Sequence, residues 1–384
     1  MKIALVHDDL IQEGGAEKLL VAMHEIWPEA PVYTSFASRA WIKKCQELNI
    51  ELRTSFMQRL PLKKRLYKFY FLLFPPAFES FNFDDFDVVL SSSARYAHGV
   101  ITKPKTLHIC YMNTPARMWW EPDQYFAARL WLRILLAPFL SFLRLWDYTA
   151  AQRVNFFIAN SKTPQSRIKK YYGRESEIVY PFASLSCHSD AAGRIPQIQS
   201  KGRLAKHRAQ DDIGKYFLVV TRLVSWKRVE IAIEACKELG LSLVIVGRGQ
   251  DLKRLKKIAE GYRQIKFHDQ ANDEELSKLY AGCQAVIITQ AEDFGMVAVE
   301  AASFKKLVIA FGAGGSLEVV KEGQTGQFFS PQTSEALAET LQKFGQVRYD
   351  DLTPFAEVAE SFSKEKFKIS LAAAVDRFYV LPNS

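Results

Sequence analysis

The chain has 384 residues, 48% of them hydrophobic and 24% charged. That composition is ordinary for folded protein, and the length excludes a single hydrophobic core, so two domains are expected. The net charge of +9 favours an anionic partner, which composition leaves open as nucleic acid, anionic lipid or a phosphorylated substrate.

The N-terminal residues and the cysteines indicate the cellular compartment in which the protein is expected. Residues 1–6 have the pattern of a buried strand and lack the pattern of a signal peptide. Arg or Pro interrupts the apolar stretches well short of the ~20 residues that a spanning helix needs. Five scattered cysteines without a Cys-x-x-Cys motif are typical of reduced, buried thiols. We therefore expect a cytoplasmic protein.

In the first half of the chain, short apolar runs alternate with helical patterns, as they do in doubly wound domains. Helices are predicted at Ala16–Trp27 and from Asn160-Ser161, a start of the capping type, to Tyr172. Strands are predicted at Lys2–His7, Val32–Phe36, Val88–Ser91, Leu107–Met112 and Phe156–Ala159. This pattern predicts a first domain over residues 1–185.

A second alternating series follows residues 186–212, which are rich in Ser, Gly, Lys, Arg and Gln and are predicted to form a linker or surface loop. Helices are predicted at Val229–Leu239, Asp251–Gly261, Asp273–Ala281 and Val297–Phe304. Strands are predicted at Tyr216–Thr221, Ser242–Val246, Ile265–His268, Ala285–Thr289 and Leu307–Ala310. The series predicts a second domain over residues 213–360.

Two such blocks predict the α/β class, with two Rossmann-like, doubly wound domains facing a cleft. Residues 361–384 are predicted to form a C-terminal helix that crosses back to the first domain.

Two acidic residues flank a predicted helix start in the second domain. Glu292 follows the Ala285–Thr289 strand, and Glu300 lies in the next helix. Ligands of doubly wound domains bind beyond the carboxyl ends of strands, so both carboxylates should border the cleft. The helix start between them, formed by Phe294, Gly295, Met296 and Val297, offers free backbone N–H groups to an anion. This arrangement suits a sugar diphosphate nucleotide, with phosphate on the turn and hydroxyls on the carboxylates.

Basic side chains and a glycine-rich loop follow two other strands of this domain. Arg222 and Lys227 come after the Tyr216–Thr221 strand and can converge on a diphosphate. The segment Gly312-Ala-Gly-Gly-Ser-Leu-Glu318 follows the Leu307–Ala310 strand, where glycines permit close approach to a ligand. Each feature alone is also typical of an ordinary surface loop.

Six motifs occur together in one order along nearly the whole chain. They are Glu13-Gly-Gly-Ala-Glu17, Ala159-Asn-Ser161, Ile178-Val-Tyr-Pro181, Thr221-Arg-Leu with Trp226-Lys227, Glu292-Asp-Phe-Gly with Glu300, and Gly314-Gly-Ser-Leu-Glu318. In this combination the chain resembles the retaining GT-B glycosyltransferases of the glycosyltransferase group 1 (GT4-type) family, which includes bacterial lipopolysaccharide and exopolysaccharide mannosyltransferases.

The resemblance implies a role for each matched residue. Arg222 and Lys227 would neutralise the diphosphate leaving group. Glu300 would hold the nucleotide ribose, while Glu292 and the backbone of residues 294–297 would hold the donor sugar. Gly14 and Gly15 would let the first domain's loop approach the phosphates and the acceptor. Three further residues in matched segments are candidates for acceptor binding or support: Glu17, Arg117 and Glu318.

The resemblance also implies that no metal or other cofactor takes part, because basic side chains and a helix N-terminus supply the positive charge. Asp85-Phe-Asp87 imitates a metal-binding Asp-x-Asp, but it precedes a strand and is predicted to be a surface turn. Where the family often has a catalytic His, this chain has Asn113, which can hydrogen-bond a hydroxyl but cannot shuttle a proton. His108 lies within a predicted strand and is interpreted as a core histidine.

Two segments of the first domain combine basic and bulky apolar residues. Residues 130–148 place Arg133, Ala137, Ser141, Arg144 and Tyr148 on one narrow stripe of an otherwise apolar helix, which Pro138 is predicted to kink or divide. Residues 62–78 join a basic cluster to a run of aromatic and aliphatic residues. Both fit an interfacial patch on an anionic membrane, and both would equally fit burial in the first domain.

We therefore predict a retaining hexosyltransferase of cell-surface polysaccharide synthesis, peripheral on the inner face of the plasma membrane. GDP-mannose is the favoured donor by resemblance, and a glycan or polyprenyl-diphosphate-linked molecule is the expected acceptor. UDP-sugars stay open because no motif recognises the base, which is expected near residues 267–271. The alternatives are an inverting enzyme of the same fold and a nucleotide-sugar-binding protein without turnover. No nucleic-acid partner is expected, since no nucleic-acid-binding module is present.

Overall fold

The structure is a computed structural model that describes residues 1–61, 70–122, 130–183, 185, 216–269, 271–344 and 351–381. The chain forms two compact units. The first comprises Met1–Pro181 with Lys364–Ser384, and the second comprises Phe182–Ser363. The predicted linker at residues 186–212 lies outside the described residues.

The first unit is built on a seven-stranded, entirely parallel sheet in the order β3-β2-β1-β4-β5-β6-β7. Its strands are β1 (Ile3–His7), β2 (Val32–Thr34), β3 (Leu52–Thr54), β4 (Val88–Ser93), β5 (Leu107–Met112), β6 (Phe156–Ala159) and β7 (Ser176–Ile178). All five predicted strands are present, although β2 is two residues shorter and β4 two residues longer than expected. The three-residue strands β3 and β7 were not predicted, because so short a run carries no clear periodicity.

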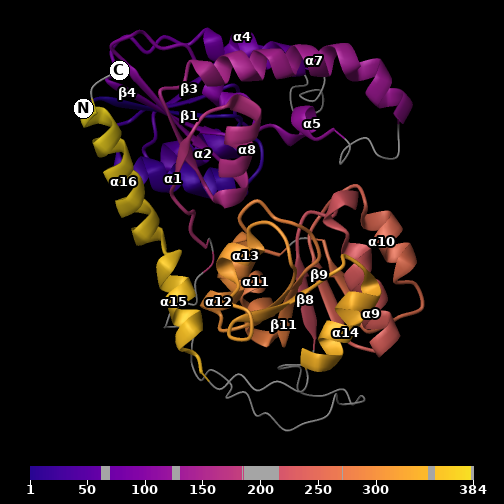
Figure 1. The fold of residues 1–384 in the computed structure, drawn as a ribbon. Coiled ribbons are helices and arrows are strands. Elements are labelled where there is room, and N and C mark those ends of the chain that lie inside the picture. The colour runs from indigo at the N-terminus through magenta and orange to yellow at the C-terminus, as the bar shows by residue number, and fades with distance from the viewer. Residues whose placement is uncertain are drawn as a thin grey trace. The chain divides into compact units, whose positions relative to one another are not determined.

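Helices flank this sheet (Figure 1). The helices of the first unit are α1 (Gly15–Ile26), α2 (Arg39–Glu47), η1 (Phe56–Arg59), η3 (Phe71–Leu73), α4 (Phe74–Glu79), η4 (Ala97–Gly99), α5 (Arg117–Trp120), α7 (Leu130–Gln152), α8 (Lys162–Tyr172) and α16 (Lys364–Val380). Helix α16, from the far end of the sequence, lies beside α1, and Lys364 Nζ donates to Glu25 Oε1 at 2.5 Å.

Pro138 does not divide the helix that contains it. Helix α7 runs unbroken from Leu130 to Gln152 with Pro138 inside it, so of the two predicted outcomes, a kink or a division, the division is wrong. The inward face of α7 holds the segment in place, because Leu143, Trp146 and Ala150 pack into the main core cluster of the unit. Tertiary packing thus outweighs the local cost of an internal proline.

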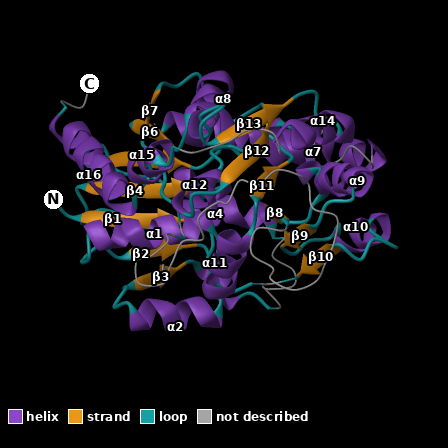
Figure 2. Cartoon of the chain, turned by 90° about the horizontal axis from the view of Figure 1, so that it is seen from below, coloured by secondary structure: helices purple, strands orange, loops and turns teal. Residues whose placement is uncertain are grey.

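The second unit contains a six-stranded parallel sheet in the order β10-β9-β8-β11-β12-β13, whose strands lie side by side in Figure 2. Its strands are β8 (Phe217–Val220), β9 (Leu243–Val246), β10 (Ile265–His268), β11 (Ala285–Ile288), β12 (Leu307–Phe311) and β13 (Gly326–Phe329). Its helices are η5 (Ser225–Lys227), α9 (Val229–Leu239), α10 (Leu252–Ile258), α11 (Asp273–Gly282), α12 (Met296–Ser303), α13 (Ser316–Val319), α14 (Ser334–Phe344) and α15 (Thr353–Ser361).

Both sheets confirm the predicted α/β class with doubly wound parallel strands. In each sheet the order in which successive strands are added reverses once, between β1 and β4 in the first unit and between β8 and β11 in the second. Loops that leave the carboxyl ends of two such neighbouring strands diverge and leave a crevice for ligands. The strand order therefore places the loops after β8 and β11 at the ligand-binding edge of the second unit.

Candidate functional site

The predicted donor residues Lys227 and Glu292 meet at this switch point. Strands β8 and β11 pair in register at Phe217 with Ala285, so the loops that follow them start side by side. The loop after β8 ends in η5, which carries Lys227, and the loop after β11 carries Glu292. Sixty-five positions of sequence separate the two residues, and only the adjacency of their strands brings them together.

Lys227 and Glu292 form a two-fold hydrogen-bonded ion pair. Lys227 Nζ donates to Oε1 and to Oε2 of Glu292, each at 2.7 Å. Lys227 is only 6% exposed, and its ammonium lies 4.4 Å from the centre of the Trp226 ring. A buried ammonium needs an opposite charge close by, and the carboxylate and the ring face both supply negative potential.

Thr289 and Gln290 also hold this pair, and sequence reasoning missed both. Gln290 Nε2 donates to Glu292 Oε1, while Thr289 Oγ1 donates to the backbone oxygen of Lys227 at 2.7 Å and contacts Gln290 Oε1 at 3.3 Å. Both side chains are buried. Their position directly after β11 was the one available signal, because polar residues at the carboxyl end of a buried strand face the ligand edge.

Glu300 lies one helical turn beyond the start of α12 and is 6% exposed. Its Oε2 accepts a hydrogen bond of 2.7 Å from the hydroxyl of Tyr280, a residue that no sequence motif marked. Burial, and then the neighbouring carboxylate, raise the pKa of Tyr280 well above its usual value. Tyr280 therefore stays protonated and acts as a hydrogen-bond donor that orients Glu300.

The predicted anion turn begins at Gly295, whose φ of +97° ends the β11 loop and starts α12. A side chain is strained in that conformation, which explains the glycine. Phe294 turns inward, is 3% exposed and packs on Phe362 at 5.2 Å between ring centres. Only its backbone is thus available to a ligand, while Met296 and Val297 form the half-buried first turn of the helix.

The glycine loop after β12 packs against the loop that carries Glu292. Gly315 N donates to the backbone oxygen of Glu292 at 2.7 Å, and Gly314 has a φ of +70°. A Cβ on Gly314 would lie 2.3 Å from Glu292 O, and one on Gly315 would lie 2.2 Å from Phe294 O. These glycines therefore allow one loop backbone to lie directly on another, and Glu318 follows them, half-buried, on α13.

A second glycine pair, which sequence reasoning also missed, supports the loop of Arg222. A Cβ on Gly247 would lie 1.8 Å from Thr221 O, and one on Gly249 would lie 1.9 Å from Leu223 O. The backbone of Leu223 also donates to Arg248 O at 2.8 Å. Arg222 itself is exposed between these anchored residues. The Gly-Arg-Gly sequence directly after β9 was a signal for this contact.

In the first unit, Gly14 and Gly15 begin α1 after the loop that follows β1. Glu17 turns back toward that start, because a Cβ on Gly14 would lie 3.0 Å from Glu17 Oε2. Glu17 is 4% exposed, and its burial raises the pKa of the carboxyl above its usual value.

Asn113 follows β5, and its side chain turns toward the end of β4. Its Nδ2 donates to Ser92 Oγ at 3.2 Å and lies 3.4 Å from Ser93 O. Arg117 is half-buried at the start of α5. His108 is fully buried in β5, where Nε2 lies 2.9 Å from Ser91 Oγ. Burial, together with the neighbouring His98 and Arg153, lowers the pKa of His108 to about 3, so it stays neutral in the core.

Helix α7 exposes most of its large apolar side chains. The exposed ones are Trp131, Ile134, Leu135, Phe139, Phe142, Leu145 and Tyr148. In the segment 62–78, Phe74 and Phe78 are buried in the core, whereas Leu72 is exposed. Residues 62–69, which include the predicted basic cluster, lie outside the described residues. Within the described parts of the chain, no helix combines the length and the hydropathy that crossing a bilayer would need.

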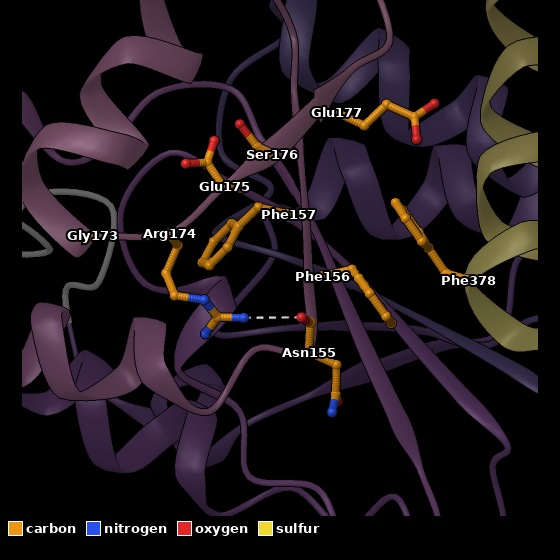
Figure 3. Close-up of a pocket in the computed structure, with 9 residues that line it drawn as sticks. All are labelled: Asn155, Phe156, Phe157, Gly173, Arg174, Glu175, Ser176, Glu177 and Phe378. Carbon is orange, nitrogen blue, oxygen red and sulfur yellow. Dashed lines mark hydrogen bonds between the residues drawn. The ribbon is translucent and has the colours of Figure 1, made fainter. Parts of the chain in front are cut away.

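A pocket of about 450 Å³ lies away from all these residues (Figure 3). It opens near the amino ends of β6 and β7, where Phe156 stacks on Phe378 and Arg174 donates to Asn155 O at 2.9 Å. This is the edge opposite the ligand-binding edge of a parallel sheet, and none of the predicted site residues lines the pocket.

Comparison with known proteins supports the interpretation of the second unit as a glycosyltransferase domain. Residues 202–354 match the family described as glycosyl transferases group 1. An uncharacterized glycosyltransferase of Methanocaldococcus jannaschii is 25% identical over 229 residues, which is 56% of this chain and 55% of that protein. A glycogen synthase of Pseudomonas aeruginosa is 28% identical over 137 residues, 34% of this chain and 27% of that protein. The matches to the first curated relatives cover from 27% to 36% of their lengths.

Solved structures resemble the whole chain. The Anabaena protein HepE in complex with UDP-glucose is 18% identical, with a TM-score of 0.67 over 98% of this chain and 100% of that one. Sucrose-phosphate synthase from Thermosynechococcus elongatus is 13% identical, with a TM-score of 0.69 over 98% of this chain and 99% of that one. The chain therefore has the predicted GT-B fold, and the family match falls within its second unit.

Proposed function

We propose that this protein is a glycosyltransferase that transfers a hexose from a nucleotide-sugar donor, with retention of configuration, to a glycan or polyprenyl-diphosphate-linked acceptor. The observation that carries the proposal is the partly buried Lys227–Glu292 pair at the switch point of the second sheet, within the segment that matches the glycosyltransferase family.

Lys227 needs a negatively charged partner and Glu292 needs hydrogen-bond donors, and a bound donor could supply both. A donor diphosphate offers negative charge to Lys227 and to Arg222, and the sugar offers hydroxyl hydrogens to Glu292. When the donor binds, Lys227 would turn from the carboxylate to the phosphate, and the carboxylate would accept from the sugar. Glu300, oriented by Tyr280, would accept from the ribose hydroxyls, and the backbone at Gly295 would face phosphate.

The leaving diphosphate would carry much of the chemistry. Its developing negative charge would be stabilised by Lys227, Arg222 and the N-terminus of α12, without a divalent metal. A phosphate oxygen would then take the proton of the attacking acceptor hydroxyl on the same face of the sugar, which gives retention. Asn113 cannot take a proton near neutral pH, and its role would be to hydrogen-bond the acceptor hydroxyl.

GDP-mannose is the favoured donor because of the resemblance to bacterial mannosyltransferases. UDP-sugars are the second candidate, and the similarity to the UDP-glucose complex of HepE favours them. A nucleotide-sugar-binding protein without turnover would keep the same site residues.

Attachment to the cytoplasmic face of an anionic membrane completes the proposal. The apolar side chains that α7 exposes form a surface of the kind that inserts among lipid headgroups. The net charge of +9 favours anionic lipid, and a lipid-linked acceptor would be met there, in line with a role in cell-surface polysaccharide synthesis.

A thermal-shift screen against GDP, UDP, ADP and their sugars tests the donor. A ligand that binds only the native state raises stability by RT ln(1 + [L]/Kd), so one nucleotide should stand out from the rest. The selected sugar nucleotide is then incubated with lipid extract in EDTA, and the anomeric configuration of the product is read by NMR. Donor binding without transfer would identify a binding protein, a strict Mn²⁺ requirement would contradict the metal-free reaction, and no shift with any nucleotide would refute the proposal.

A further inference from the structure

A chain of buried polar groups joins α7 to the end of β4. Asp147, on α7, is fully buried, and its Oδ2 accepts hydrogen bonds from Trp120 Nε1 at 2.7 Å and from Tyr172 Oη at 2.8 Å. Its Oδ1 lies 3.2 Å from Nε2 of His98, which is 1% exposed; this is a close polar contact that lacks hydrogen-bond geometry. The other ring nitrogen, Nδ1, lies 3.1 Å from Ser93 Oγ. The contacts run Asp147–His98–Ser93.

Local packing fixes the position of each group. Gly99 allows Trp146 of α7 to lie directly on η4, because a Cβ on Gly99 would be 2.3 Å from Trp146 Cζ2. The turn between β4 and η4 is tied to β1, since Asp8 Oδ1 accepts from the backbone N–H groups of Tyr96 and Ala97 at 2.7 Å. His98 is therefore held on a rigid turn between a helix and a strand end.

The polar contacts end at Ser93, which contacts Asn113, a residue of the proposed acceptor site. Ser93 is the last residue of β4, and its backbone oxygen accepts from Asn113 N at 2.8 Å, with Asn113 Nδ2 at 3.4 Å. The hydroxyl of Ser93 that His98 holds and the carbonyl that Asn113 contacts belong to one residue. Ser93 is therefore the residue through which the contacts of His98 reach Asn113.

We propose that Asp147, His98 and Ser93 are positioning residues that fix Asn113 for the acceptor hydroxyl, and that they connect Asn113 to the membrane-facing helix α7. The inference rests on the proposed function, because Asn113 matters here as an acceptor ligand. The carboxylate orients the imidazole, the imidazole orients the hydroxyl, and none of the three touches the substrate. The same order of support, carboxylate to imidazole to hydroxyl, orients catalytic groups in other enzymes.

Another serine of β4, the strand that carries Ser93, provides a matched control. Ser91 is also buried in β4, and its hydroxyl also lies within hydrogen-bond distance of a buried histidine, His108 Nε2, at 2.9 Å. Ser91 lies two residues from the strand end and does not contact Asn113. Ser93→Ala and Ser91→Ala therefore remove equivalent bonds, but only the first bond supports Asn113.

The test compares the two variants in acceptor kinetics, donor kinetics and the NMR signal of the Asn113 side-chain amide. Ser93→Ala should lower kcat/KM for the acceptor about fivefold, the scale of one hydrogen bond of about 1 kcal/mol, with the KM for the donor unchanged. It should also shift the ¹⁵N–¹H resonances of Asn113 Nδ2, whereas Ser91→Ala should leave kinetics and resonances within error of wild type. If the Asp147→Asn variant folds, it should show the same acceptor defect. If it does not fold, the comparison of Ser93→Ala with Ser91→Ala tests the inference by itself.

Equal behaviour of Ser93→Ala and Ser91→Ala would overturn the inference, as would equal losses toward donor and acceptor. If the wild-type protein transfers no sugar, the proposed function fails, but the amide resonances still decide whether the chain positions Asn113.

Discussion

Lys227 Nζ lies 2.7 Å from each carboxylate oxygen of Glu292, so a buried ammonium and a half-buried carboxylate form an ion pair. Under the proposed function, a diphosphate would replace the carboxylate at Lys227, and a sugar hydroxyl would replace the ammonium at Glu292. A preformed positive charge at the point where a leaving group becomes negative is the arrangement that electrostatic catalysis requires.

Lys227→Ala and Glu292→Ala should each lower turnover at least ~100-fold, the scale for loss of one preorganised electrostatic contact. Steady-state transfer assays measure the effect. The control is Lys278→Ala, which breaks an exposed Lys–Glu pair of 2.6 Å in the same unit and should leave activity unchanged. Activity of both site variants within threefold of wild type would refute the donor-site assignment.

Gln290→Ala should weaken donor binding about tenfold, because Glu292 Oε1 loses the amide donor of Gln290, although Lys227 still donates to the carboxylate. Gln284→Ala is the matched control, since Gln284 is exposed on the same chain segment just before β11. Isothermal titration with the nucleotide selected by the thermal-shift screen gives the affinities. An unchanged donor affinity in Gln290→Ala would show that Glu292 needs no such support.

Gly314→Ala should destabilise the protein by about 1–3 kcal/mol and abolish donor binding, because the new Cβ would overlap the backbone oxygen of Glu292. Urea unfolding and nucleotide titration measure the two effects. Gly323→Ala is a close control: its φ of +74° is similar, but a Cβ there meets no atom within 4 Å. It should show only the smaller cost of strain and keep full binding. The same loss of binding in both variants would mean that strain alone, and not the contact with the Glu292 loop, is responsible.

Glu17→Gln should stabilise the protein more at pH 7 than at pH 4. Burial raises the pKa of Glu17 in the folded state, so the folded protein binds its proton more tightly than the unfolded chain does. The free energy of unfolding must then fall as the pH rises from the unfolded pKa through the folded one, and glutamine removes this loss. Melting temperatures across that range measure it, with the exposed Glu29→Gln as the control. A difference in melting temperature between wild type and Glu17→Gln that stays constant across this pH range would contradict the expectation.

Replacing Ile134, Leu135 and Leu145 of α7 with serine should abolish co-sedimentation with vesicles that contain anionic lipid. These side chains are between 63% and 66% exposed, so their loss should leave the fold intact. The exposed Thr149→Ala on the same helix is the control and should bind as wild type does. Wild-type recovery that is equal with anionic and neutral vesicles, or absent with both, would exclude the proposed membrane contact.

The sequence by itself determined the α/β class and most of the strands, because buried parallel strands are short, apolar and separated by helical periods. It also predicted that Lys227, Glu292 and Glu300 belong to one site, because residue types at strand ends and a family pattern mark them. It could not show that Lys227 and Glu292 bind each other, because that depends on β8 lying next to β11.

Tertiary structure alone decided the supporting contacts. Tyr280 and Gln290 carry no motif, and they reach the two glutamates only through helix packing and the end of β11. The Asp147–His98–Ser93 chain joins three separate segments for the same reason. The apolar face of α7 was visible in the sequence, but which of its side chains remain exposed depended on where the rest of the first unit packs against it. Sequence patterns report local periodicity and residue chemistry, whereas partners distant in the chain are set by strand order and packing.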